Sequence, residues 1–173
     1  MFGFYEEDER MKKVAVIMGS DSDLKTMQGA VDVLQEMEIP FTVRIISAHR
    51  TPDTAHEFAR SAEDAGFGAI ICGAGKAAHL AGAFAANTTL PIIGVPIKSS
   101  TLDGLDALLS TVQMPAGMPV ATVAIDGAAN AALLAAQMIA LSDEGLAARI
   151  AELRRAQTEK VLQKDKEIEA MFA

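Results

Sequence analysis

The sequence predicts an α/β protein with a parallel sheet and helices on both of its faces. Short apolar, β-branched runs alternate along the chain with amphipathic or Ala-rich helical patterns. The apolar runs recur at intervals that leave room for one helix between them, which is typical of right-handed βαβ units. No Ser/Gly-rich linker or shift in composition interrupts residues 13–142, so we expect one α/β catalytic domain there.

The first half of the chain contains two strands and two helices. The predicted strands are Val14–Met18, an apolar run typical of a strand buried on both faces, and Phe41–Ile46. Between them lies a helix that Pro40 ends, and its apolar stripe consists of Leu24, Met27, Val31, Leu34 and Met37. Pro52 opens the second helix, which we expect to end near Gly66.

The second half continues the alternation. We predict a third strand at Ala69–Cys72, closed by the loop Gly73–Lys76, and then an Ala-rich helix to about Asn87. The fourth and fifth strands are expected at Pro91–Pro96 and Pro119–Ala124. An Ala-rich helix is expected to follow, from about Ala129 to Leu141.

The two ends of the chain differ from this domain. Residues 1–12 are predicted to be an acidic N-terminal extension, without the apolar run of a signal peptide. Residues 143–173 carry spaced apolar residues among many charges and contain no proline. A helix of about 30 residues spans about 45 Å, which exceeds the radius of a compact domain of this size. We therefore expect a projecting helix that packs on another subunit, with a frayed tail as the alternative.

Composition narrows the possible functions. The formal net charge is −8, which argues against non-specific binding to nucleic acid. The single cysteine allows no intrachain disulfide and fits a cytoplasmic protein, and the three histidines are too scattered for a metal site. Polar residues interrupt the apolar stretch near residue 130, so no membrane span is expected.

Polar side chains cluster where the predicted strands end. Because ligands of parallel α/β sheets bind beyond the carboxyl ends of the strands, we expect these loops to form one crevice. They comprise Ser20, Asp21, Ser22 and Asp23 after the first strand, Ser47, Ala48, His49 and Arg50 after the second, Gly73, Ala74, Gly75 and Lys76 with His79 after the third, and Lys98–Ser100 after the fourth.

The first two loops favour a phosphorylated sugar as ligand. Ser20 and Ser22 precede a helix, whose free N–H groups and dipole attract phosphate, while Asp21 or Asp23 can accept hydrogen bonds from sugar hydroxyls. Simple helix capping is the alternative. Arg50 can bind a phosphate through two hydrogen bonds. The neighbouring His49 would be available for proton transfer near neutral pH, and a solvated loop histidine is the alternative.

The third loop imitates a dinucleotide-binding motif. Gly73 and Gly75 allow the backbone to approach a ligand closely. The motif follows the third strand rather than the first, however, and no acidic residue ends the next strand, so an NAD-dependent oxidoreductase is poorly supported. His79 is expected about one turn into the next helix, either facing the crevice or bonding within the core.

Several segments together resemble the N5-carboxyaminoimidazole ribonucleotide mutase family, the class I form of phosphoribosylaminoimidazole carboxylase. The resemblance covers about residues 13–165, and the matching segments are 19–23, 47–52, 73–75, 77–80, 89–96, 102–110, 112–115 and 127–137. Three departures stand out: Lys76 where the family usually has Gly, Ala81 where it usually has Pro, and a shorter segment around Asp126.

The resemblance implies a flavodoxin-like, three-layer subunit, usually assembled as a homo-octamer. It implies interconversion of two carboxylated aminoimidazole ribonucleotides without metal or organic cofactor, by loss of CO₂ and its recapture at ring position 4. Matched residue by residue, Ser20, Asp23 and Arg50 would bind the nucleotide, with Asp21, Ser22 and Ser47 nearby. His49 matches the general acid/base, and Gly73, Ala74, Gly75, His79 and Leu80 match a loop over the imidazole and carboxylate.

Two other functions remain open at this point. The class II relative carboxylates aminoimidazole ribonucleotide directly with CO₂, and the physics of the sequence does not separate it from the mutase. A binding module for phosphoribosyl nucleotides would keep the first loop and Arg50 but would give His49 no task.

Overall fold

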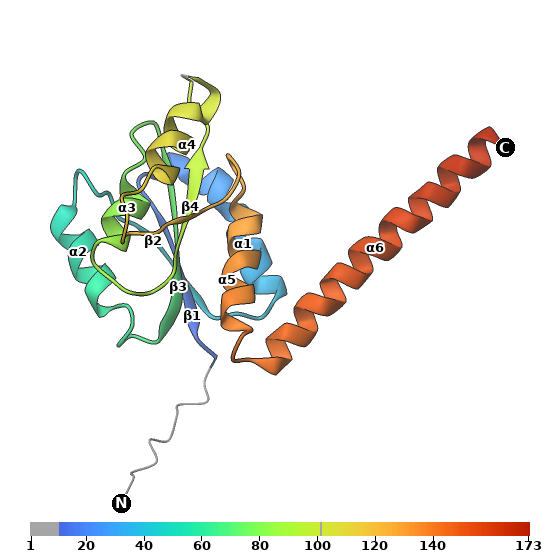
Figure 1. The fold of residues 1–173 in the computed structure, drawn as a ribbon, viewed down its shortest axis with the longest axis horizontal. Coiled ribbons are helices and arrows are strands. Elements are labelled where there is room, and N and C mark those ends of the chain that lie inside the picture. Colours follow the sequence, from blue (N-terminus) through green and yellow to red (C-terminus); the bar gives the residue numbers. More distant parts are fainter. Residues whose placement is uncertain (1–10, 101) are drawn as a thin grey trace, which may run out of the picture.

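Five parallel strands form the central sheet of the computed structural model, which describes residues 11–100 and 102–173. The strand order is β2-β1-β3-β4-β5, so β2 lies on one side of β1 and β3, β4 and β5 follow on the other side. The strands are β1 (Lys13–Met18), β2 (Phe41–Ile45), β3 (Phe67–Gly75), β4 (Ile92–Ile97) and β5 (Ala121–Thr122). Figure 1 shows the sheet between two groups of helices, as the sequence predicts.

Helices cover both faces of the sheet. Leu24–Glu36 (α1) and Ala128–Ile139 (α5) pack on one face, and Pro52–Ser61 (α2) and Leu80–Ala85 (α3) pack on the other. Leu105–Val112 (α4) contacts α3 and β4. The remaining elements are the 3-10 turns η1 (Asp21–Asp23) and η2 (Leu102–Gly104) and the terminal helix α6 (Glu144–Phe172).

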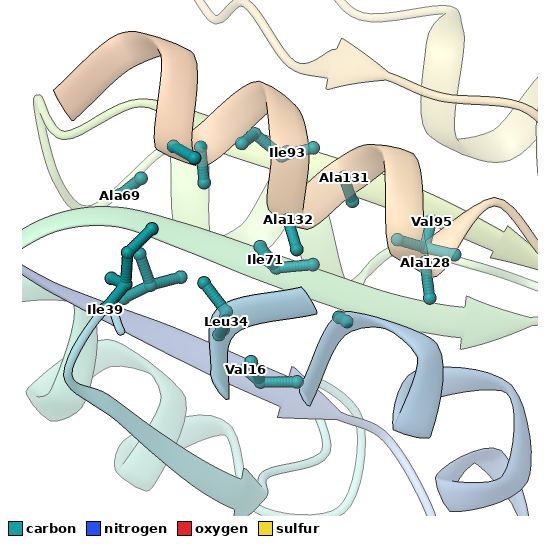
Figure 2. Close-up of a cluster of buried hydrophobic side chains, with 14 of the residues drawn as sticks. Val16, Leu34, Ile39, Ala69, Ile71, Ile93, Val95, Ala128, Ala131 and Ala132 are labelled. Carbon is teal, nitrogen blue, oxygen red and sulfur yellow. The ribbon is translucent and has the colours of Figure 1, made fainter. Parts of the chain in front are cut away.

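Alternating side chains of the strands build two separate cores. Val14, Val16 and Met18 of β1 point into the core beneath α1 and α5, whereas Ala15 and Ile17 point into the core beneath α2 and α3. Figure 2 shows the first core, where Leu34 of α1 meets Val16 and Ile71 and the alanines of α5 lie over Ile93 and Val95. Small residues in α5 allow it to approach both the sheet and α1, which explains its Ala-rich sequence.

The structure corrects four details of the sequence prediction. β3 continues through Gly75, because residues 73–75 pair with Val95–Ile97 of β4 instead of forming a loop. β5 is only two residues long, since this edge strand pairs with just Ile93 and Gly94. α4 was not predicted, and Leu24 is 46% exposed, so it lies outside the buried stripe of α1.

The last helix leaves the domain, as predicted. The Asp143 side chain caps α6 by accepting a hydrogen bond from the Leu146 amide at 2.8 Å. Leu146 and Ile150 are buried in the first core, and Arg149 Nε donates to the Met37 carbonyl at 3.1 Å. The rest of α6 extends away from the sheet (Figure 1). Residues 1–10 of the predicted N-terminal extension lie outside the described residues.

Candidate active site

A cavity of about 690 Å³ lies beyond the carboxyl ends of β1–β4. Of the residues that the sequence predicts as a site, it is lined by Ser20, Ser22, Asp23, Ser47, Ala48, His49, Arg50, Ala74, Gly75, Lys76 and Leu80. Lys98 and Ser99 after β4 also line it. Four loops that are distant in sequence therefore meet in one crevice, at the edge where parallel α/β sheets bind ligands.

The first loop is a complete capping box. The Ser20 amide donates to Asp23 Oδ2 at 3.1 Å, and Ser20 Oγ accepts a hydrogen bond from the Ser22 amide at 3.4 Å. Asp21 Oδ1 accepts hydrogen bonds from Ser20 Oγ and from the Ser22 amide. The capping interpretation is thus correct for this loop. Capping also holds Ser20, Ser22 and Asp23 at the cavity wall, whereas Asp21 supports the loop without lining the cavity.

Asp23 is a half-buried carboxylate in this loop. Burial raises its pKa above the usual aspartate value. Hydrogen bonds from the Ser20 amide and the Ser22 hydroxyl oppose that rise, as does the positive charge of Arg50. Folding therefore makes the ionised form of Asp23 less favourable, which a ligand that donates hydrogen bonds to the carboxylate would reverse.

The second loop is held by its own polar side chains. Ser47 and Thr51 exchange two hydrogen bonds, since the Ser47 amide donates to Thr51 Oγ1 at 2.9 Å and Thr51 Oγ1 donates to the Ser47 carbonyl at 3.0 Å. The Arg50 guanidinium then crosses to the first loop, where it donates to the Gly19 carbonyl at 2.6 Å. Arg50 therefore connects the two loops from which the sequence predicts phosphate binding. The positioning role of Thr51 was not predicted.

His49 and His79 meet across the cavity wall. His49 Nε2 lies 2.9 Å from His79 Nδ1, and the ring planes are inclined at 85°. His79 is the N-cap residue of α3 rather than a residue one turn into the helix, because residues 76–79 remain outside the helix. It does not line the cavity itself. The pair gives the site one cavity-facing imidazole supported by a second imidazole.

The two glycines at the end of β3, Gly73 and Gly75, have different roles. A Cβ atom at Gly73 would collide with Met27 Sδ of α1, so this glycine permits helix packing. Gly73 does not line the cavity, which differs from the ligand approach expected of it. Gly75 does line the cavity, and a Cβ there would come within 3.1 Å of the Ile97 carbonyl oxygen.

Cations dominate the charged lining of the cavity. Lys25, Arg50, Lys76 and Lys98 line it, whereas Asp23 is the one carboxylate among the described lining residues. This local positive field contrasts with the formal net charge of −8 and favours an anionic ligand. Lys25 and Thr26, in the first turn of α1, were missed as candidates, and their position just after a capping box was the available signal.

The described residues contain neither a grouped set of metal ligands nor a membrane-spanning helix. Within residues 11–100 and 102–173, no three His, Cys, Asp or Glu side chains are grouped so that they could hold a metal ion. Over the same part of the chain, no helix has the length and apolar character needed to cross a bilayer.

Comparison with known proteins identifies the relatives of this chain. The family model described as AIR carboxylase matches residues 13–160. N5-carboxyaminoimidazole ribonucleotide mutase of Brucella melitensis is 58% identical over 153 residues, covering 87% of this chain and 94% of the relative. The Escherichia coli mutase is 52% identical and covers 87% and 90%. The crystal structure of Treponema denticola PurE is 27% identical, with a TM-score of 0.80 over 90% of this chain and 97% of that one.

Proposed function

The chain belongs to the AIR carboxylase family, and on that premise we propose that it is a mutase of purine biosynthesis. Its reaction interconverts N5-carboxyaminoimidazole ribonucleotide and 4-carboxy-5-aminoimidazole ribonucleotide, the activity named by relatives of 50% to 60% identity. The position of His49 is the observation that supports this reaction most directly. Its ring lines the cavity beside Arg50 and is held by His79.

The phosphate of the nucleotide is assigned to the first loop and Arg50. Ser20 and Ser22 offer hydroxyl groups at the start of the η1–α1 helical run, where the helix dipole favours an anion. The Arg50 guanidinium already lies against the Gly19 carbonyl at the beginning of this loop. Asp23 then accepts hydrogen bonds from ribose hydroxyls, which compensate the carboxylate for its burial.

The reaction requires two proton transfers that cancel. In the first step the bond between the carbamate nitrogen and carbon breaks, CO₂ leaves, and the nitrogen gains a proton from the His49 imidazolium. In the second step C4 of the ring attacks CO₂, and the proton on C4 returns to His49. One imidazole thus serves as acid and then as base, a role worth about 10²–10⁴-fold in rate.

Small residues leave space for the released CO₂ beside the ring. Ala48, Ala74 and Gly75 line the cavity next to His49 and fill little of its volume. Retention of CO₂ depends on proximity and on a closed, dry pocket, because an escaped molecule must be recaptured from solution. Binding energy at the distant phosphate holds the reacting ring in place for the second step.

The proposal extends to the state of the protein in the cell. We propose a cytoplasmic homo-oligomer, an octamer by resemblance to the family, which works without metal or organic cofactor. The exposed apolar residues on the outer part of α6 support association between subunits.

A spectroscopic assay of the interconversion tests the proposed function. With purified protein and either carboxylated ribonucleotide, in the absence of metal and bicarbonate, we expect conversion to the other. When labelled bicarbonate is added, the label should stay out of the product. Free mixing of the label into product at every turnover would contradict trapped CO₂. Carboxylation of aminoimidazole ribonucleotide by CO₂ as the only reaction would assign the class II activity instead.

A further inference from the structure

Lys76 lines the cavity and has an unusual backbone conformation. It directly follows β3, its φ is +54°, and its side chain lines the cavity. Positive φ is the left-handed region that glycine adopts easily and that long side chains rarely adopt. Non-glycine residues in this region cluster at functional sites, where the surrounding structure holds them. The side chain is therefore a candidate for a task that glycine could not perform.

Lys76 and Lys98 are neighbouring cations that differ in their ion pairs. β3 pairs with β4 so that Gly75 lies opposite Ile97, which places Lys76 and Lys98 next to each other beyond the ends of adjacent strands. Lys98 Nζ forms an ion pair with Asp103 at 3.0 Å. Within residues 11–100 and 102–173, Lys76 forms no ion pair. Its ammonium is thus available to a ligand, while the charge of Lys98 is already paired.

Lys76 and Arg50 reach the same cavity from different loops. The Arg50 guanidinium reaches the Gly19 carbonyl, at the loop assigned to the phosphate. Lys76 belongs instead to the segment 76–79, which ends in His79, and the His79 ring contacts His49. Lys76 therefore lines the same cavity as His49, and it belongs to the segment whose last residue contacts the His49 ring.

We propose that Lys76 is a specificity-determining residue whose ammonium binds the carboxylate of the two carboxylated ribonucleotides. The inference rests on the proposed function, because that substrate carries a second anionic group at the reacting ring. Charge-assisted hydrogen bonds between an ammonium and a carboxylate are among the stronger polar contacts in proteins. Lys76 thereby allows this site to distinguish carboxylated ribonucleotides from the nucleotide that has lost CO₂.

This contact has a kinetic consequence. CO₂ is neutral, so the ammonium loses its partner when the carbamate or carboxylate breaks down. Lys76 therefore stabilises substrate and product more than the species between them, and such binding lowers KM without raising kcat. Removal of the charge should raise KM and leave kcat unchanged or higher, the opposite of the kcat loss expected from a catalytic residue.

Binding of two stable ligands tests the proposal. In a His49→Asn background that blocks turnover, calorimetry is used to measure the affinity of 4-carboxy-5-aminoimidazole ribonucleotide and of 5-aminoimidazole ribonucleotide. Lys76→Met keeps the length of the side chain and removes its charge. We expect this change to weaken binding of the carboxylated ligand about tenfold and to leave the other affinity unchanged.

Three further variants separate charge from backbone conformation. Lys76→Gly relaxes the left-handed residue and should match Lys76→Met in both affinities, whereas Lys76→Arg should keep most of the discrimination. Lys160→Met removes an exposed lysine from α6, outside the cavity, and should change neither affinity. The reference protein is the His49→Asn variant with Lys76 unchanged. If Lys76→Gly binds the carboxylated ligand as tightly as this reference protein, the backbone conformation rather than the ammonium explains the weaker binding of Lys76→Met, and the proposal is wrong.

Two other outcomes would contradict the proposed role of Lys76. Equal weakening of both ligands by Lys76→Met would assign Lys76 to the phosphate, and no weakening of either would remove it from the binding site. Both results overturn the inference while the proposed function stands. If the reference protein binds neither nucleotide and the native chain shows no interconversion, the proposed function fails, and the inference fails with it.

Discussion

His49 Nε2 and His79 Nδ1 lie 2.9 Å apart although the two residues follow different strands of the sheet. In a hydrogen bond between two neutral imidazoles, one ring donates and the other accepts, so this contact couples the tautomers of the two rings. It also fixes the orientation of His49 before any ligand enters. We therefore infer that His79 positions His49, the imidazole that lines the cavity.

Replacement of His49 by Asn should separate turnover from binding. We expect His49→Asn to lower kcat by at least about 10²–10⁴-fold, because the carbamate nitrogen and ring carbon lose their proton donor and acceptor. Affinity for the ribonucleotide, measured by calorimetry, should persist, since Arg50 and the first loop are unchanged. His56→Asn is the matched control, because His56 is exposed on α2 and lies outside the cavity. Wild-type turnover by His49→Asn would remove the catalytic assignment.

Arg50 should contribute to affinity rather than to proton transfer. Arg50→Ala removes a charged, forked donor from the proposed phosphate site, and we expect ribonucleotide affinity to fall about 10–100-fold. The hydrogen bond to the Gly19 carbonyl is also lost, so the first loop should become less ordered. Arg60→Ala, at an exposed position on α2, serves as the control. Unchanged affinity of Arg50→Ala in direct binding measurements would contradict the phosphate role.

The Asp23 carboxylate should lower the free energy of unfolding while it contributes to ribonucleotide binding. Its pKa is raised in the folded protein, chiefly by burial, so the folded state holds the proton more tightly than the unfolded state. The free energy of unfolding should fall as pH rises from the unfolded pKa of 3.8 through the folded value, and the loss should persist above it. We expect Asp23→Asn to raise Tm at pH 7, to lose that advantage near pH 3, and to weaken ribonucleotide binding.

A series of melting curves with and without nucleotide checks this prediction. Asp32→Asn is a suitable control, since Asp32 is exposed on α1 and lies outside the cavity. A stabilising effect of Asp23→Asn that is the same at pH 3 and pH 7 would show that the carboxylate charge is not its source.

Local sequence predicts strands better than it predicts where they end. The apolar run from Val14 to Met18 and the Ala-rich α5 are explained by burial, and the structure confirms both. Gly73 and Gly75 have the composition of a loop, yet pairing with β4 keeps them in β3, and that pairing involves residues more than 20 positions away. α4 was missed because its exposed leucines obscure a helical stripe.

The candidate site likewise combines features that the sequence predicts with features that it does not. The loops after β1 and β2 carry clusters of polar residues, and the sheet brings them together as predicted. By contrast, two relationships depend on three-dimensional packing. One is the contact between His49 and His79, and the other is the close packing of Met27 on Gly73, which leaves no space for a Cβ atom. Neither relationship leaves a signal in the spacing of residues along the chain.

The close packing of Met27 on Gly73 can be tested by a double-mutant cycle. Gly73→Ala places a Cβ against Met27 Sδ, and overpacking of this kind costs about 1–3 kcal/mol in the free energy of unfolding. Met27→Ala destabilises by about 2–5 kcal/mol because it leaves a cavity. The double variant should be more stable than the sum of the two losses predicts, since each change relieves the other. Additive losses in denaturant titrations would exclude the contact as the reason for glycine.

The outer part of α6 should hold subunits together rather than stabilise its own domain. Leu162 and Ile168 are each 55% exposed, and Phe172 is 85% exposed, so these side chains gain little from the fold of a single chain. A helix with apolar residues that no neighbour covers is typical of a protein–protein contact. We expect Leu162→Ser combined with Ile168→Ser to reduce the oligomer mass measured by light scattering, with the circular dichroism spectrum nearly unchanged.

The matched control is Lys160→Ser combined with Lys166→Ser, which makes the same number of changes at exposed charged positions of the same helix and should leave the mass unaltered. If both double variants keep the full mass, subunit contacts do not depend on these apolar residues, and the outer helix needs another explanation.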